Sequence, residues 1–224
     1  MAVNKEAYQK IIEELTPKQV TLVAVSKIKP VSDIMELYNL GQRDFGENYV
    51  QELVDKATQL PKDIRWHFIG HLQSNKVKYI APFVHLIHGV DSFNLLKEIN
   101  KQGAKSGRII DILLQVHIAE EETKFGLDEE EVNVLMGKLA DVQMPQVRVC
   151  GLMGMGSFSE DLEKVRAEFR HLKSILDKQR LPLSLKLQGA SPTLSMGMSS
   201  DYKIAIEEGS TLVRIGSLLF GMRN

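Results

Sequence analysis

A lysine follows a short apolar run near the amino terminus, and its amine could act as a nucleophile. Residues 22–30 read LVAVSKIKP, so an apolar, β-branched run is followed by Lys27 and closed by Pro30, whose ring resists continuation of a strand. Partial burial removes hydration from an amine, and the uncharged form can condense with a carbonyl group. A lysine that packs on the rim with its head in water is the alternative. The sequence around Lys27 does not by itself distinguish a nucleophilic amine from a solvated rim lysine.

The last predicted strand ends in residues suited to an anion. Residues 210–217 read STLVRIGS, which places Arg214 just before Gly216 and Ser217. A strand that finishes in glycine followed by a hydroxyl residue leaves backbone amides free to approach an anion closely.

A second segment suited to an anion comes before this strand in the sequence. Residues 194–201 read LSMGMSSD, with Ser199 and Ser200 at the start of an expected helix. Amides, helix dipole and hydroxyls all favour a phosphate there, whereas simple N-capping is the alternative for either serine. Two such segments together favour a phosphate site.

Two other patterns are interpreted as structural. His67 and His71 have the even spacing of residues on one side of a strand, but no third metal ligand accompanies them at suggestive spacing, so we expect hydrogen-bonded histidines and no metal. The glycines of GLMGMG, residues 151–156, do not follow a dinucleotide-binding fingerprint. They indicate a bulge or a close approach by another group.

Short apolar runs alternate with stretches of helical periodicity along the whole chain. The predicted strands are Thr21–Ser26, Arg43–Asn48, Trp66–His71, Val84–Asp91, Asp111–Ile118, Arg148–Met155, Ser184–Ala190 and Ser210–Ser217. The predicted helices are Val31–Leu40, Tyr49–Gln59, Ser74–Ile80, Ser92–Gln102, Asp128–Ala140, Ser159–Lys178 and Asp201–Glu208, with an additional amphipathic helix before the first strand. Their starts are signalled by possible caps at Asp33, Ser92, Asp128 and Ser159.

This alternation predicts a single α/β domain over residues 1–224, a (β/α)₈ barrel of the TIM type. Parallel strands need crossover helices, and eight strands can close the sheet without an exposed edge. A doubly wound open sheet is the alternative. In a barrel, chemistry lies where strands end, which is where Lys27, Asn48 and Arg214 fall.

Composition excludes several classes of partner. The net charge of −1 offers no basic excess for nucleic acid, although a local site for a small phosphorylated ligand stays open. The single cysteine cannot form an intramolecular disulfide, and no apolar run is long enough to span a bilayer. The amino-terminal segment lacks the apolar centre of a signal peptide. We therefore expect a cytoplasmic protein without membrane partners.

Several blocks resemble one known family in collinear order from Leu22 onward. They are AVSKIKP, FGENYVQE, WHFIGHLQSNK, ETKFG, GLMGM, LSMGMSSD and VRIGSLLFG, and together they closely resemble the pyridoxal phosphate homeostasis protein family. The resemblance implies a barrel like the amino-terminal domain of alanine racemase, with pyridoxal 5′-phosphate (PLP) held as a Lys27 aldimine. It implies seven cofactor-binding residues, namely Lys27, Asn48, Ser199, Ser200, Arg214, Gly216 and Ser217.

The resemblance also implies a role for each of these positions. The two serines, with the amides after Arg214, would hold the phosphate. Arg214 would face the pyridine nitrogen, and Asn48 would lie near the ring. An arginine cannot accept a proton from the ring nitrogen, which makes the ring a poorer electron sink than one paired with a carboxylate.

Three functions follow as expectations. The first is a non-catalytic PLP carrier that supports vitamin B6 homeostasis and supply, with PLP-dependent apo-enzymes as acceptors. The second is a PLP-dependent amino-acid racemase, and the third is a cofactor-free Schiff-base aldolase. Racemization needs a second acid/base, which a tyrosine of another subunit supplies in alanine racemase. Because the chain ends at Asn224, just after the last predicted strand, we expect no domain that supports such a dimer. We expect a monomeric carrier.

Three residues in or near these motifs have no assigned role. His117 stands where many relatives have a residue that looks like asparagine, which leaves the polar contacts of that strand end undefined. Lys29 and Lys124 could assist exchange of the cofactor, or could be solvated rim lysines.

Overall fold

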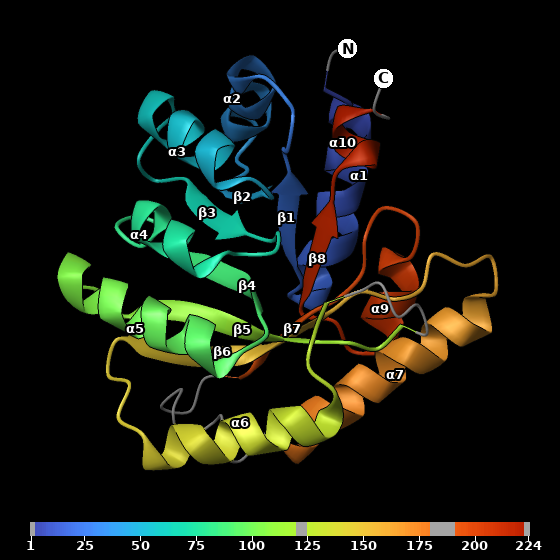
Figure 1. The fold of residues 1–224 in the computed structure, drawn as a ribbon. Helices are drawn as coiled ribbons and strands as arrows, with labels where there is room; N and C mark the ends of the chain where they lie inside the picture. Colours follow the sequence, from blue (N-terminus) through green and yellow to red (C-terminus); the bar gives the residue numbers. More distant parts are fainter. Residues whose placement is uncertain (1–2, 120–124, 180–190, 222–224) are drawn as a thin grey trace.

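Eight parallel strands close into a barrel in the computed structural model, which describes residues 3–119, 125–179 and 191–221 (Figure 1). Each strand pairs with the next along the chain, and the last pairs with the first, so the sheet has no edge. The strands are β1 (Thr21–Val25), β2 (Asp44–Glu47), β3 (Arg65–Phe68), β4 (Leu86–Val90), β5 (Ile110–Val116), β6 (Val147–Gly154), β7 (Thr193–Ser195) and β8 (Leu212–Ile215). The predicted barrel is confirmed, and the open sheet is excluded.

Helices surround the barrel and connect its strands (Figure 1). They are α1 (Lys5–Leu15), α2 (Val31–Asn39), α3 (Val50–Gln59), α4 (Val77–Ile80), α5 (Phe93–Ser106), α6 (Glu129–Asp141), α7 (Leu162–Lys178), α9 (Tyr202–Glu207) and α10 (Ser217–Phe220), with 3₁₀ turns η1 (Thr16–Lys18) and η2 (Ser74–Lys76). None of the helices in the described part of the chain combines the length and apolarity needed to cross a bilayer.

Two of the predicted helix caps are confirmed and two are wrong. The side chain of Ser92 accepts from Leu95 at 3.3 Å, and Asp128 forms a reciprocal capping box with Glu131. Asp33 lies inside the first turn of α2 instead, because that helix begins directly after Pro30. Ser159 is replaced as the cap of α7 by Asp161, which accepts from the amides of residues 163 and 164.

The seventh strand lies later in the chain than its sequence pattern suggested. β7 is Thr193–Ser195, and it pairs with Leu152 and its neighbours on β6. The predicted strand at Ser184–Ala190 lies outside the described residues. Gly151 on β6 explains how closely the two strands approach, since a Cβ atom there would lie 1.9 Å from the carbonyl oxygen of Thr193. The expected close approach is therefore made by a neighbouring strand.

The apolar core has two separate parts. The larger part fills the space between the barrel and its helices, and Phe45, Phe68 and Phe169 are among its fully buried side chains. A smaller cluster lies inside the barrel and consists of Val23, Leu86, Leu113, Met153 and Leu212. The barrel interior is thus only partly apolar, which leaves room there for polar side chains.

The first and last described helices lie side by side next to the barrel. Helix α1 covers β1 and buries Tyr8, Ile11 and Leu15, and it lies next to α10 (Figure 1). The amide of Asn4 donates to the carbonyl oxygen of Leu219 at 2.8 Å. The amino-terminal helix therefore supports the segment that follows the last barrel strand.

Candidate functional site

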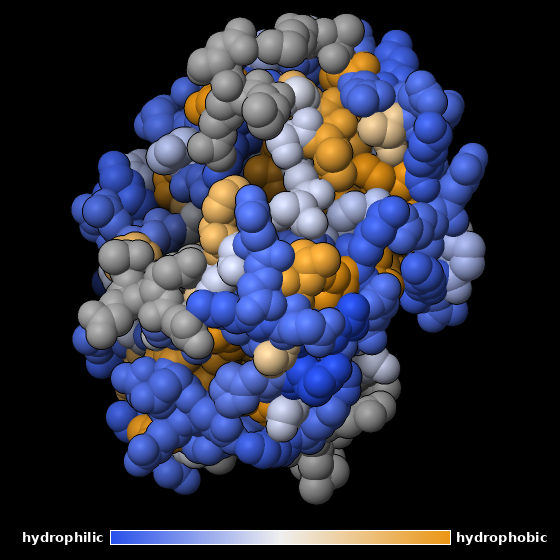
Figure 2. All heavy atoms as spheres, turned by 90° about the vertical axis from the view of Figure 1, so that its right-hand side faces the viewer, coloured by the Kyte–Doolittle hydropathy of each residue, from blue (hydrophilic) through white to orange (hydrophobic). Residues whose placement is uncertain are grey.

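One cavity of about 690 Å³ opens where the strands end. All seven residues singled out in the sequence line it: Lys27, Asn48, Ser199, Ser200, Arg214, Gly216 and Ser217. The remaining lining residues include Lys29, Ile69, Met155, Phe158 and Met198. Viewed from the side, the molecule has a hollowed face with hydrophobic residues gathered around the hollow (Figure 2). Residues far apart in the sequence are thus brought together, whereas their roles toward a cofactor stay predictions.

A buried polar network holds the backbone that presents Lys27. The hydroxyl of Ser26 donates to Glu47 Oε1 at 2.6 Å, and Lys56 Nζ donates to the Ser26 carbonyl oxygen at 2.7 Å. The next residue, Ile28, adopts a left-handed conformation with φ of 58°, and its amide donates to Glu52 Oε1 at 2.6 Å. Lys27 itself is half-buried between these anchored residues.

The carboxyl group of Glu47 is fully buried within this network. Burial raises the pKa of Glu47, and the charge and hydrogen bond of Lys56 oppose that rise. Lys56 Nζ lies 2.8 Å from Glu47 Oε1 and 2.6 Å from Glu52 Oε1. A buried lysine therefore compensates two carboxylates behind Lys27.

The segments after β7 and β8 are hydrogen-bonded to each other. The amide of Gly216 donates to Ser199 Oγ at 3.3 Å, and the amide of Arg214 donates to the carbonyl oxygen of Gly197 at 3.0 Å. Gly197 has φ of 96°, and a Cβ atom there would lie 2.6 Å from Cβ of Ala205. The hydroxyl and amide groups expected to bind an anion thus lie in two connected loops.

Arg214 is a buried cation beside the cavity. Its Nη1 donates to Ser195 Oγ at 2.5 Å, and its Nη2 donates to the carbonyl oxygen of Gly154 at 3.1 Å. Burial lowers the pKa of Arg214 to about 10, and the charge of Asp201 opposes that shift. The guanidinium therefore stays charged at neutral pH and remains a donor.

Asn48 carries a polar atom that suits a ligand. Its Oδ1 is buried and has no hydrogen-bond partner in the described structure, although the residue lines the cavity. A buried acceptor without a donor costs about 1–3 kcal/mol, so a ligand that donates there would remove a real penalty. The cavity is therefore polar at the level of β2 as well as at β8.

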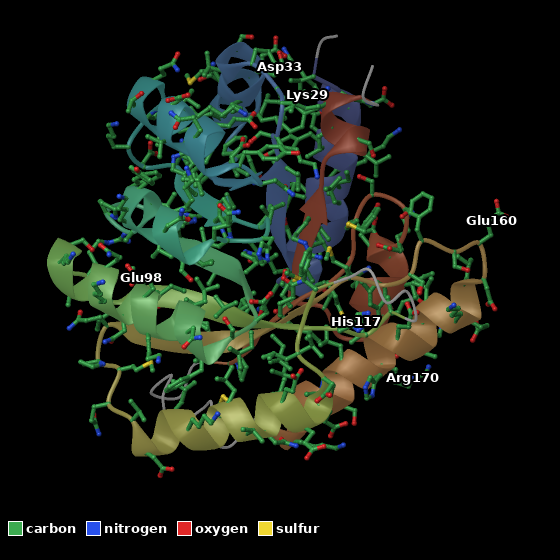
Figure 3. The ribbon with its side chains drawn as sticks, in the orientation of Figure 1. Lys29, Asp33, Glu98, His117, Glu160 and Arg170 are labelled. Atoms are coloured by element: carbon green, nitrogen blue, oxygen red, sulfur yellow. The ribbon has the colours of Figure 1, made fainter. Side chains whose placement is uncertain are left out.

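Lys29 lies at the open end of the barrel beside α10 (Figure 3). Its Nζ donates to the carbonyl oxygen of Phe220 at 2.7 Å. That contact closes the loop after β1 onto the carboxyl end of the chain. Lys124, the other lysine of the resembling motifs, lies outside the described residues.

The described charged residues that line the cavity are all cationic. Lys27, Lys29 and Arg214 contribute three cations, and none of the described residues that line the cavity is acidic. A protein with a net charge of −1 thus concentrates positive charge at one place. A small anion that also carries an aldehyde fits this donor set, because the amine of Lys27 and the hydroxyl-bearing loops after β7 and β8 share one cavity.

The histidines take positions that spacing alone did not reveal. His67 lies inside the barrel, where its Nε2 is 2.9 Å from Asp44 and its Nδ1 is 2.9 Å from His88. His71 instead stacks on Phe125 with ring centroids 4.5 Å apart. His117 has its backbone amide bonded to the carbonyl oxygen of residue 127. Sequence reasoning missed His88, whose only signal was its place on a buried strand.

Comparison with known proteins gives the family. Residues 5–224 match the family model for the alanine racemase N-terminal domain. The pyridoxal phosphate homeostasis protein of Aquifex aeolicus is 44% identical over 90% of this chain and 86% of its own length. PipY of Synechococcus elongatus, solved with PLP bound, superposes with a TM-score of 0.84 at 34% identity and covers 96% of this chain and 99% of its own.

A more distant likeness concerns the fold alone. Alanine racemase from Bartonella henselae superposes with a TM-score of 0.70 at 16% identity, over 96% of this chain and 57% of the enzyme. The barrel found here is therefore of the kind that alanine racemase uses for its amino-terminal domain. Family model, sequence identity and superposition agree over nearly the whole chain, and the chain belongs to the pyridoxal phosphate homeostasis protein family.

Proposed function

We propose that this protein binds PLP through Lys27 and passes it to acceptors without catalytic turnover. The observation that carries the proposal is a single cavity that combines the amine after β1 with the cationic and hydroxyl-bearing loops after β7 and β8. Two relatives support it: one is named for PLP homeostasis, and the other was solved with PLP bound.

Each lining residue has a distinct task in this proposal. PLP, when bound, supplies an aldehyde that condenses with a primary amine and releases water. Lys27 provides the amine, and Ser199 and Ser200 hold the phosphate together with the amides of Gly216 and Ser217. Arg214 donates toward the ring nitrogen, and Asn48 Oδ1 accepts from the ligand. An incoming amine of a free acceptor or an apo-enzyme then displaces Lys27.

The absence of turnover is supported by what surrounds Lys27. Racemization needs a second acid/base that can reach the opposite face of the bound amino acid. Among the described lining residues there is no tyrosine, histidine or carboxylate, and Lys29 is bonded to the carbonyl oxygen of Phe220. A closed barrel also has no sheet edge to pair with a second copy, so a monomer suffices.

The binding proposal is tested by covalent trapping. Purified protein incubated with PLP should absorb visible light, and borohydride should fix the cofactor to Lys27 as a mass increase located by peptide mapping. Lys27→Ala should lose both signals, whereas Lys29→Gln, a change on the same loop, should keep them. A normal visible band and an adduct elsewhere in Lys27→Ala would defeat the proposal.

The non-catalytic part needs a separate assay. Loaded protein is incubated with single L-amino acids, and the product is analysed by chiral chromatography. We expect no formation of the D-enantiomer above a protein-free PLP control. Turnover that depends on Lys27 would instead make the protein a racemase.

A further inference from the structure

A line of hydrogen-bonded side chains runs behind Arg214 and crosses the inside of the barrel. Arg214 Nη1 donates to Ser195 Oγ at 2.5 Å, and Ser195 Oγ lies 3.0 Å from His88 Nδ1. Ser195 belongs to β7 and His88 to β4, so this contact joins strands that are not neighbours in the sheet. All three side chains are buried.

The same line continues to the opposite end of the barrel. His88 Nε2 lies 2.9 Å from His67 Nδ1, and His67 Nε2 lies 2.9 Å from Asp44 Oδ1. Asp44 also accepts from Arg65 Nε at 2.8 Å, and about half of the Arg65 side chain reaches solvent. A continuous chain therefore connects the amino-terminal rim of the barrel with the cavity.

The chemistry of its two ends restricts the directions that the hydrogen bonds in the chain can take. Arg214 can only donate, so Ser195 Oγ accepts from it and has its own proton left for His88 Nδ1. Burial lowers the pKa of His88 well below its usual range, so this ring is neutral and carries its proton on Nε2. With the His88 proton on Nε2, His67 accepts at Nδ1 and donates from Nε2 to the carboxylate of Asp44. This assignment satisfies every contact in the chain.

A metal ion is the competing interpretation of the outer end. Ligand atoms of Asp44, His67 and His85 lie within 4.8 Å of one another. However, Arg65 already donates to both carboxylate oxygens of Asp44, and its positive charge opposes a cation at that place. The hydrogen-bond chain accounts for the positions of Asp44 and His67 without an added ion.

The chain restricts what Arg214 can do. Its Nη1 is held by Ser195 and its Nη2 by the carbonyl oxygen of Gly154, so the plane of the guanidinium is fixed while the residue still lines the cavity. A planar group bonded at two nitrogens presents its remaining donors in one direction. Loss of the acceptor at Ser195 would free that plane to rotate.

We propose that Ser195, His88 and His67 are positioning residues, which orient Arg214 as a donor toward the bound cofactor through a one-way hydrogen-bond chain that starts at Asp44. The inference rests on the proposed function, because it assigns the residues behind the cation that contacts PLP. No proton is transferred along the chain. Its effect is to set where Arg214 lies and therefore how the cofactor ring is held and polarised.

The first test needs no cofactor. Cofactor-free protein labelled with ¹⁵N-histidine is studied by NMR near neutral pH, and the side-chain signals of His67 and His88 are assigned with the variants His67→Gln and His88→Gln. Both rings should be neutral and protonated at Nε2. An Nδ1-protonated tautomer or an imidazolium at either ring would overturn the proposed direction of the chain.

The second test cuts the chain and measures PLP binding. His88→Leu removes both ring nitrogens at similar volume and should weaken PLP binding about tenfold, because a bond that orients a charged donor is lost, and should shift the visible absorption maximum. His88→Gln, which can accept and donate at once, should recover most of the affinity and the wild-type maximum. If His88→Leu does not fold, Ser195→Ala cuts the adjacent link and is measured in its place.

A matched control separates positioning from packing. Leu86→Ala alters another side chain inside the barrel on the same strand, and it should leave affinity within about twofold and the absorption maximum unchanged. Equal effects of His88→Leu and Leu86→Ala would overturn the inference. Failure of the proposed function looks different, since wild-type protein would then form no adduct at Lys27 while the NMR measurement would still decide the direction of the chain.

Discussion

At the scale of single residues, the ion pair between Lys56 and Glu47 is the contact whose loss should be most costly. The Glu47 side chain is fully buried, the Lys56 side chain is 7% exposed, and their charged atoms lie 2.8 Å apart. Lys56→Met leaves the carboxylate buried without a cation, which should lower the free energy of unfolding by about 3–5 kcal/mol. Urea denaturation followed by circular dichroism measures the loss.

Two further variants test the cause of that loss. Adding Glu47→Gln to Lys56→Met removes the unpaired charge and should restore part of the stability. Lys10→Met breaks an ion pair with Glu6 whose two side chains are largely exposed, and it should change stability little. A double variant no more stable than Lys56→Met would contradict the role assigned to the buried pair.

Asp44 gives a pH dependence of stability with a defined sign. Burial alone would raise the pKa of Asp44, but hydrogen bonds from Arg65 and His67 outweigh it and lower the pKa to about 2. Because the folded-state pKa lies below the usual value of 3.8, the stabilisation is complete above that value and is lost as the pH falls toward 2. The loss should amount to about 2 kcal/mol. Asp44→Asn should flatten the profile of urea midpoints over this acidic range.

At the scale of elements, the pairing of β6 with β7 depends on one glycine. A Cβ atom at Gly151 would lie 1.9 Å from the Thr193 carbonyl oxygen, so Gly151→Ala must push the two strands apart. We expect a loss of about 3 kcal/mol or more in the free energy of unfolding.

A glycine-to-alanine substitution on α6 should increase stability instead of lowering it. A Cβ atom at Gly137 has no neighbouring atom within 4 Å, so Gly137→Ala should stabilise the helix by about 0.5–1 kcal/mol. Urea midpoints of both variants make the comparison. Similar destabilisation by the two substitutions would show that the close approach of β7 is not the cause.

At the scale of the whole molecule, ligand binding should appear as thermal stability. A ligand that binds only the folded barrel at 100 times its dissociation constant adds about 2.7 kcal/mol. For a chain of this length, that corresponds to a rise in Tm of about 5–10 °C. Differential scanning fluorimetry with PLP should show the rise.

Two controls isolate the covalent contribution to this rise. Pyridoxine 5′-phosphate carries an alcohol in place of the aldehyde and should raise Tm much less. Lys27→Ala should reduce the shift with PLP to the same small value. An equal rise with both ligands in the wild-type protein would mean that the phosphate loops, and not Lys27, supply most of the affinity.

The barrel was predictable because its signals are local. Short apolar runs and capping residues such as Ser92 and Asp128 act within a few neighbours, so the order of strands and helices could be written down from the sequence. Asp33 and Ser159 were misassigned as caps because their own helices begin at different residues. Which candidate becomes the cap depends on how each helix packs against the barrel.

The seven cavity residues were also within reach of the sequence. Lys27 and Arg214 each stand at the end of an apolar run, and parallel strands bring such ends to one face. The barrel topology alone therefore predicts that these residues lie near one another at one end of the barrel.

The polar chain behind that cavity depended on the folded structure. His88 and Ser195 are 107 positions apart and meet across the inside of the barrel, and no local pattern encodes such a contact. Local periodicity decides which residues form a strand and which side faces inward. Barrel closure decides which inward side chains meet, because that depends on the register of all eight strands at once.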